Sequence, residues 1–159
     1  KEPAKNVPLW RKALEIIVPL LIAAAVGLGG FMLRPSRGYR FHASSTYSGY
    51  KQDGWTGLLR SGDILFCTNN QMDPWVEIDL AKKRTVHRVA VVNRPDYKDR
   101  VLPLVVEVLE PDGSYREVGR KSDTFDEWTF DFPPVETTKL RLRVDGRATW
   151  LHLSRVNID

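Results

Sequence analysis

The sequence has little cysteine and lacks the short motifs that commonly carry chemistry. Cys67 is the only cysteine among 159 residues, which excludes an internal disulfide and a multi-cysteine metal site. There is no glycine-rich phosphate loop, no metal-ligand spacing and no interleaving of aromatic and basic residues typical of nucleic-acid binding. We therefore expect no cofactor, no metal and no nucleic-acid partner, and a fold that depends on its hydrophobic core.

Histidine, the commonest general base, is also scarce. His42, His87 and His152 each lie in or beside a predicted strand, and none belongs to a recognisable motif with a nucleophile and a carboxylate. Cys67 is most simply a small buried hydrophobe. The sequence therefore indicates that the protein is not an enzyme.

Positive charge is present but is not concentrated. The chain has 24 Lys and Arg against 20 Asp and Glu, which gives a formal net charge of +4. The longest basic run, Lys82–Arg84, sits where a turn is expected between two strands. We interpret it as a solvent-exposed turn and not as a site for a polyanion.

One long segment lacks charge altogether. Ile16–Leu33 contains no charged residue, and as a helix it would be about 27 Å long, close to the hydrocarbon thickness of a bilayer. A basic tail before such an apolar run resembles a secretory signal peptide, and we expect an uncleaved signal anchor. The predicted organisation is a basic tail at 1–12, a transmembrane helix at 13–34, a linker at 35–40 and one domain at 41–159.

The flanking charges and the small residues of this span carry two further predictions. Basic residues lie on both sides, but the short basic tail favours a cytoplasmic N-terminus and a C-terminal domain outside, which in a bacterium is the periplasm. Ala23 and Gly27, like Ala25 and Gly29, are four residues apart and share a helix face that another helix could approach closely. This face predicts packing against other membrane subunits, with lipid around the rest, although Gly and Ala are common in membrane helices.

After residue 40 the sequence follows the period of β-strands. Pro111–Ser114 is a predicted turn, because Pro presets φ and Gly accepts a positive φ. No helical period of useful length interrupts the strands, so we predict an antiparallel β-sandwich. The predicted strands, with alternating or β-branched apolar residues, are Trp75–Leu80, Val86–Val92, Leu104–Leu109, Glu127–Phe132 and Lys139–Val144.

Several short runs beyond the anchor occur in a distinctive order. They are Ala43–Ser48, Asp53-Gly54, Pro74–Leu80, Val89, Asn93-Arg94, Asp96-Tyr97, Arg100, Val106–Val108, Asp112-Gly113, Lys139–Leu142 and Leu151–Ser154. In this order and spacing, residues 41–159 resemble a discoidin domain, the coagulation-factor C-type module with a galactose-binding-like fold. The resemblance implies a mainly β chain: an antiparallel jelly-roll β-sandwich, here preceded by one transmembrane α-helix.

The resemblance implies a structural calcium ion in some members. Asp53-Gly54 and Thr56 match the loop that supplies its oxygen ligands. Many calcium-binding members have a glutamate after the closing Leu-Ser, where this chain has Arg155. We expect calcium to be absent, with Arg155 in the place of the ion beside Asp53 or a nearby carbonyl; the alternative is that Arg155 points to solvent.

The resemblance also implies recognition of glycans, phospholipid headgroups or proteins by loops at one end of the sandwich. Fucose-binding relatives hold sugar hydroxyls with a histidine and two arginines. Arg94, Asp96 and Arg100 resemble that pattern with a shorter spacing, and Asn69 lies at the upstream histidine position. The alternative is that Arg94, Asp96 and Arg100 brace a loop through hydrogen bonds.

We predict that recognition uses the segments 50–60 and 93–100. Trp55 and Tyr97 could instead be buried plugs that close the sandwich. The predicted partner-binding residues are aromatic or basic, the types that dominate interface energetics: Tyr50, Trp55, Arg60, Arg94, Tyr97 and Arg100.

Two functions remain open at this point. The first is a non-catalytic accessory subunit of a larger bacterial membrane complex, of respiratory or photosynthetic type, whose sandwich contacts neighbouring subunits outside the membrane. The second is a surface-tethered, lectin-like carbohydrate-binding module.

Overall fold

The computed structural model of the chain describes residues 38–56 and 64–159, and these residues form mainly antiparallel β-structure. The strands are β1 (Arg40–Ala43), β2 (Asp53–Trp55), β3 (Phe66–Cys67), β4 (Gln71–Met72), β5 (Trp75–Val92), β6 (Leu104–Leu109), β7 (Tyr115–Lys121), β8 (Glu127–Val144), β9 (Ala148–Thr149), β10 (His152–Leu153) and β11 (Arg155–Ile158). A 3-10 helix, η1 (Lys98–Val101), precedes β6.

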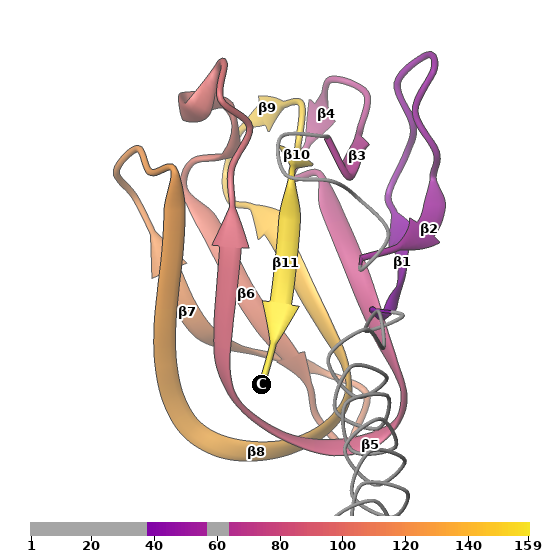
Figure 1. Cartoon of the computed structure of the whole chain (residues 1–159), viewed down its shortest axis with the longest axis vertical. Coiled ribbons are helices and arrows are strands. Elements are labelled where there is room, and N and C mark those ends of the chain that lie inside the picture. The colour runs from indigo at the N-terminus through magenta and orange to yellow at the C-terminus, as the bar shows by residue number, and fades with distance from the viewer. Residues whose placement is uncertain (1–37, 57–63) are drawn as a thin grey trace, which may run out of the picture. The chain divides into compact units, whose positions relative to one another are not determined.

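Two long strands organise the sandwich. β5 and β8 pair with each other, and each turns back on itself at the bottom of Figure 1, so that its two arms lie in different layers. β1 pairs with the first arm of β5, at Val76–Asp79, and β11 pairs with the second arm, at 89–92. β6 pairs with the second arm of β8 and with β7. The predicted antiparallel sandwich is confirmed.

The bends fall where the sequence interrupts the strand pattern. In β5 the pairing register shifts between Asp79 and Arg84, and Ala81 between them has a φ of 62°. In β8 the bend contains Pro133-Pro134, which have no N–H to donate to a neighbouring strand. Lys82–Arg84 is exposed, as predicted, but it lies in a bent continuous strand and not in a turn between two strands.

The core lies between the two layers. Leu140, Leu142 and Val144 are fully buried, whereas the alternating residues Lys139, Arg141 and Arg143 lie on the other face of β8, as their period predicts. On the first arm of β8, Trp128 and Phe130 stack with ring centroids 4.2 Å apart and pack against the core. Burial of these side chains is the main driving force for folding.

The expected replacement of calcium by Arg155 is wrong. Asp53 Oδ1 accepts a hydrogen bond from His42 Nδ1, at 2.7 Å. Arg155 pairs with Val92 on the second arm of β5, whereas β1, which carries His42, pairs with the first arm. The bend in β5 therefore separates Arg155 from Asp53. The described residues contain no group of three acidic, cysteine or histidine residues that could hold a metal.

The predicted membrane segment lies outside the described residues. This applies to the basic tail at 1–12, the span at 13–34 and its packing positions Ala23, Ala25, Gly27 and Gly29, and most of the linker. Among the residues that the structure describes, no helix is long and apolar enough to cross a membrane.

Candidate functional site

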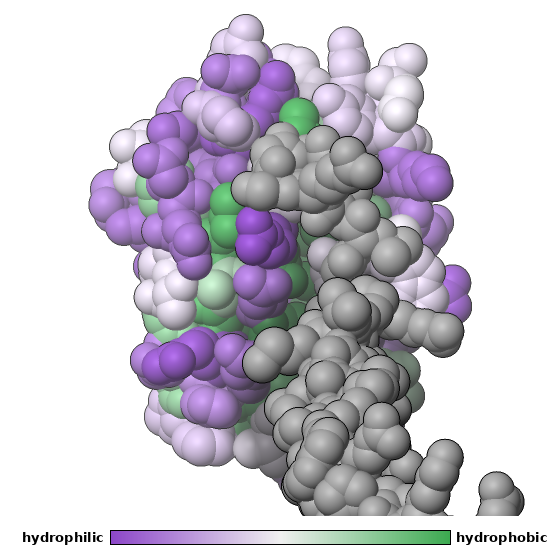
Figure 2. Space-filling view, in the orientation of Figure 1, coloured by the Kyte–Doolittle hydropathy of each residue, from purple (hydrophilic) through white to green (hydrophobic). Residues whose placement is uncertain are grey.

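The loops at one end of the sandwich form the candidate site. The β1–β2 loop, the β3–β4 segment, the η1 segment and β9 gather at the top of Figure 1, away from the bends of β5 and β8. We call this the loop end. Figure 2 shows its visible surface mostly in hydrophilic and neutral colours. Loops carried by a rigid scaffold can present binding side chains without disturbing the core.

A cavity of about 320 Å³ opens at the loop end. Its described lining comes from four separate parts of the chain: Tyr47, Tyr50, Cys67, Arg94, Arg100 and Trp150. We call it the arginine cavity. It therefore contains two guanidinium groups and three aromatic rings, and its described lining contains no carboxylate.

Arg100 is held between two aromatic rings. Its guanidinium carbon lies 4.0 Å from the ring centroid of Tyr97 and 4.8 Å from that of Trp150. Arg94 also faces Tyr97, at 5.2 Å. Such contacts attract the cation to the face of the ring and orient its plane. A guanidinium held in this way can still donate from the N–H groups at its edges.

The backbone of the η1 segment is fixed by its neighbours. The buried Asn93 donates from Nδ2 to the carbonyl oxygen of Lys98 at 3.1 Å, and its Oδ1 accepts from the backbone N–H of Arg94 at 2.8 Å. Thr149 donates from its hydroxyl to the carbonyl of Arg100 at 3.0 Å, which places the adjacent Trp150 beside Arg100. The described side-chain hydrogen bonds that brace this loop thus come from Asn93, from Thr149 and from Arg147, whose guanidinium donates to the carbonyls of Asp99 and Leu102. Among the described residues, the side chains of Arg94, Asp96 and Arg100 form none of these hydrogen bonds, and their role as braces stays an alternative.

The other wall of the cavity is equally well anchored. The backbone N–H of Tyr47 donates to the carbonyl of Cys67 at 2.8 Å, and the N–H of Tyr50 donates to the carbonyl of Tyr47 at 3.0 Å. The Thr46 hydroxyl closes the same turn on the carbonyl of Tyr50, at 2.9 Å. Tyr47 is therefore positioned by a backbone contact to β3, and Tyr50 by the turn that it forms with Thr46 and Tyr47.

Two neutral groups lie behind the arginines. His152 is fully buried opposite Cys67 in the β10–β3 pair. Burial, together with the positive charges of Arg94 and Arg100, lowers the pKa of His152 to about 4. Burial also raises the pKa of the Cys67 thiol, against the opposing effect of the same two arginines. Near neutral pH the pair is therefore an uncharged thiol and an uncharged imidazole.

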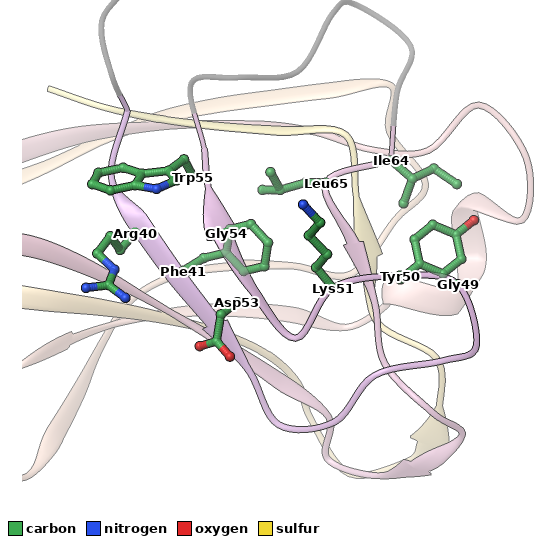
Figure 3. Close-up of a pocket in the computed structure, with 10 residues that line it drawn as sticks. All are labelled: Arg40, Phe41, Gly49, Tyr50, Lys51, Asp53, Gly54, Trp55, Ile64 and Leu65. Carbon is green, nitrogen blue, oxygen red and sulfur yellow. The ribbon is translucent and has the colours of Figure 1, made fainter.

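A second cavity, of about 460 Å³, lies beside β1 and β2. Figure 3 shows Trp55 and Arg40 at one end of it and Tyr50 at the other. Trp55 is 43 % exposed and faces the guanidinium of Arg40 at 5.9 Å. We call it the tryptophan cavity. Tyr50 lines both cavities, but only the arginine cavity is lined by residues from both segments predicted to bind.

The structure brings together only some of the predicted partner-binding residues. Tyr50, Arg94 and Arg100 line the arginine cavity, Tyr97 stacks on both arginines, and Trp55 lies in the other cavity. Because Trp55 is 43 % and Tyr97 56 % exposed, neither is a buried plug. Arg60 is outside the described residues.

The sequence analysis missed three lining residues. Cys67, and not the exposed Asn69, lines the cavity with the arginines. Tyr47 lies just before the predicted segment 50–60 and is exposed. As an aromatic residue it is of the type that the sequence analysis selected, so it could have been included. Trp150 lies far along the chain from Arg100, and no local pattern indicates that they meet.

Comparison with known proteins identifies the family. A family model described as a NedA-like, galactose-binding domain, of the F5/F8 type C group, matches residues 53–142, more than half of the chain. The chain belongs to this family. The match to the NedA-like family runs from β2 into the second arm of β8 and includes Arg94 and Arg100. Among curated proteins, none matches this sequence.

Solved structures share the fold of this NedA-like domain. CpGH89CBM32-5 from Clostridium perfringens, in complex with GalNAc-β-1,3-galactose, is 14 % identical with a TM-score of 0.63 and covers 78 % of this chain and 96 % of its own. The Streptococcus pneumoniae fucose binding module SpX-3 is 19 % identical with a TM-score of 0.60 and covers 76 % of this chain and 93 % of its own. The lectin domain of lectinolysin, complexed with Lewis B antigen, is 22 % identical with a TM-score of 0.61 and covers 77 % of this chain and 93 % of its own. The predicted discoidin-like fold is confirmed.

Proposed function

We propose that this NedA-like domain is a non-catalytic carbohydrate-binding module that holds a terminal sugar in the arginine cavity. The observation that supports the proposal best is that Arg94 and Arg100 line one cavity together with Tyr47, Tyr50 and Trp150. Of the two functions left open by the sequence, the comparisons favour this lectin-like alternative over the accessory subunit.

The lining suits a sugar in two ways. Guanidinium groups present several N–H donors in a fixed geometry, which fits the closely spaced oxygens of a sugar ring. The aromatic rings offer apolar area for the C–H faces of the ring. The structures that share this fold include a complex with GalNAc-β-1,3-galactose, a fucose binding module and a lectin domain complexed with Lewis B antigen, and a sugar of this general kind is the ligand class we propose here.

The chemistry of the cavity supports binding more than catalysis. A cysteine nucleophile must be a thiolate, and a neighbouring histidine commonly stabilises it as imidazolium. Here burial favours the neutral form of both Cys67 and His152. The pair therefore lacks the activation that a nucleophile requires.

A glycan array tests the proposal. The wild-type chain should bind a limited set of glycans, and Arg94→Ala should weaken that signal by about tenfold or more, because a charge-assisted hydrogen bond is lost. Arg116→Ala, which removes an arginine of β7 that pairs with Val108 near the end of β6, is the matched control and should bind as the wild type does. An empty array, or an array signal unchanged in Arg94→Ala, would contradict the proposal.

We further propose that the anchor at 13–34 tethers this module to a membrane, with the N-terminus cytoplasmic and residues 41–159 outside. The support is the uncharged run Ile16–Leu33 and the basic residues before it. Protease added to spheroplasts, whose periplasm is open to the medium, should digest the C-terminal domain, and resistance until the cytoplasmic membrane is broken would contradict this topology. Packing of Gly27 and Gly29 against other subunits stays a prediction.

A further inference from the structure

The arginine cavity is rich in hydrogen-bond donors and poor in acceptors. Guanidinium groups and the indole N–H only donate, and the Cys67 thiol already lies 3.6 Å from the carbonyl oxygen of Thr68. Among the described lining side chains, the phenol oxygens of Tyr47 and Tyr50 are the only oxygen acceptors. A neutral sugar hydroxyl both donates and accepts, so a site for neutral sugars commonly offers both. This lining instead favours a ligand that mainly accepts.

The two arginines also lack a carboxylate partner within the described residues. No described carboxylate forms an ion pair with Arg94 or Arg100, whereas Arg88, Arg116 and Arg120 each have at least one such partner. Asp96 and Asp99 belong to the same loop, but both are exposed and neither lines the cavity. Two positive charges therefore act on the cavity with no opposing charge in its described lining. The same two positive charges act on His152 and help to lower its pKa.

The aromatic contacts of Arg100 suit a planar anion. The guanidinium carbon lies within 5 Å of the ring centroids of Tyr97 and Trp150, at 4.0 and 4.8 Å, and a guanidinium that faces aromatic rings can still donate from the N–H groups at its edges. A carboxylate can accept two such N–H groups side by side, and this geometry gives short, charge-assisted hydrogen bonds. The volume of about 320 Å³ is at the small end of ligand pockets, which suits one terminal sugar.

We infer that the arginine cavity prefers a terminal sugar that carries a carboxylate over the matching neutral sugar. The inference rests on the proposed carbohydrate-binding function and specifies its ligand. The carboxylate binds at the edges of the Arg100 and Arg94 guanidiniums, and the ring of the sugar lies against the exposed face of Tyr47. Uronic acids and sialic acids share this chemistry.

Two pairs of sugars separate charge from shape. Galacturonic acid and galactose differ at one carbon, and 3′-sialyllactose and lactose differ by the acidic sugar. Titration calorimetry on the full chain at low salt should show at least one acidic sugar binding about tenfold more tightly than its neutral partner. The acidic member that shows the preference identifies the source of the carboxylate. Because salt screens charges, the preference should shrink as sodium chloride is raised.

Variants locate the preference on the protein. Arg100→Ala should bring the acidic-to-neutral affinity ratio close to one, whereas the control Arg116→Ala should leave it unchanged. The melting temperature of each variant shows whether it is folded. The salt dependence of the wild-type chain tests the same claim if Arg100→Ala does not fold.

The outcomes distinguish this inference from the proposed function. Equal or tighter binding of the neutral sugars overturns the inference while leaving a carbohydrate-binding module. The same holds if neither acidic sugar binds but neutral glycans bind on the array. If no glycan of any kind binds, the proposed function fails and the inference fails with it.

Discussion

Arginines occur in two contrasting settings in this domain. On the outer face of the sheet, the nearly buried carboxylate of Glu107 accepts hydrogen bonds from Arg141 at 2.7 Å and from Arg143 at 3.0 Å. Asp145 lies between Arg143 and Arg120, which together hold its pKa below the usual range. In the arginine cavity, by contrast, Arg94 and Arg100 face aromatic rings and no described carboxylate.

The difference separates charges that serve stability from charges that serve binding. A buried carboxylate with two guanidinium partners has each of its oxygens hydrogen-bonded by the protein itself. A guanidinium stacked on rings is oriented, but its N–H groups keep most of their capacity for a ligand. Substitutions should therefore affect stability on the sheet face and affinity at the loop end.

The largest expected effect is on the sheet face. Glu107→Ala removes the shared partner of Arg141 and Arg143 and leaves their positive charges close together. We expect the free energy of unfolding to fall by about 3 kcal/mol, at the low end for a broken buried ion pair because both arginines are partly exposed. Urea unfolding measures this. The control is Glu117→Ala, which removes the carboxylate of an exposed ion pair. A loss as small as in the control would remove the distinction between the two settings.

The next effect depends on pH and comes from His152, behind the cavity. Its pKa is lowered to about 4 by burial and by the two arginines, so the unfolded chain binds the proton first as pH falls. Stability is therefore fully present above the unfolded pKa and is lost as pH falls toward 4. We expect a loss of about 2 kcal/mol between pH 7 and pH 5.

His152→Gln removes the titrating group, so urea unfolding of this variant should show a weaker pH dependence over that range. His87→Gln, at an exposed histidine, should keep the wild-type dependence. Equal pH profiles for wild type and His152→Gln would show that His152 does not titrate differently in the folded state.

The smallest effect distinguishes the two cavities. Tyr97→Ala removes the ring that faces both arginines, and it should weaken sugar binding about threefold, since an exposed cation–π contact contributes under about 1 kcal/mol. Trp55→Ala removes another exposed ring, from the tryptophan cavity, and should leave affinity unchanged. Calorimetry on both variants measures this. A larger loss in Trp55→Ala would move the site to the tryptophan cavity.

Periodicity predicted the faces of the strands well, because alternation is a local property. Leu140, Leu142 and Val144 are buried as the pattern in Lys139–Val144 requires. The continuity of β5 and β8 was missed, because Lys82–Arg84 and Pro133-Pro134 interrupt the pattern without ending the pairing.

The site was predicted only where its residues are close in sequence. Arg94 and Arg100 belong to one loop and could be proposed together. Trp150 joins them because Thr149 binds the carbonyl of Arg100, a contact that depends on the complete fold. The error on Arg155 has the same origin, because its distance from Asp53 depends on the bend in β5.

The central claim is that sugar binds in the arginine cavity, and amide chemical-shift mapping tests it most directly. The labelled full chain would be titrated with galactose and, separately, with 3′-sialyllactose. We predict shifts that saturate at residues 44–50, 93–103 and 147–152, with none at the 110–116 hairpin. Saturating shifts confined to Arg40 and Trp55, or to the sheet face around Glu107, would contradict the account.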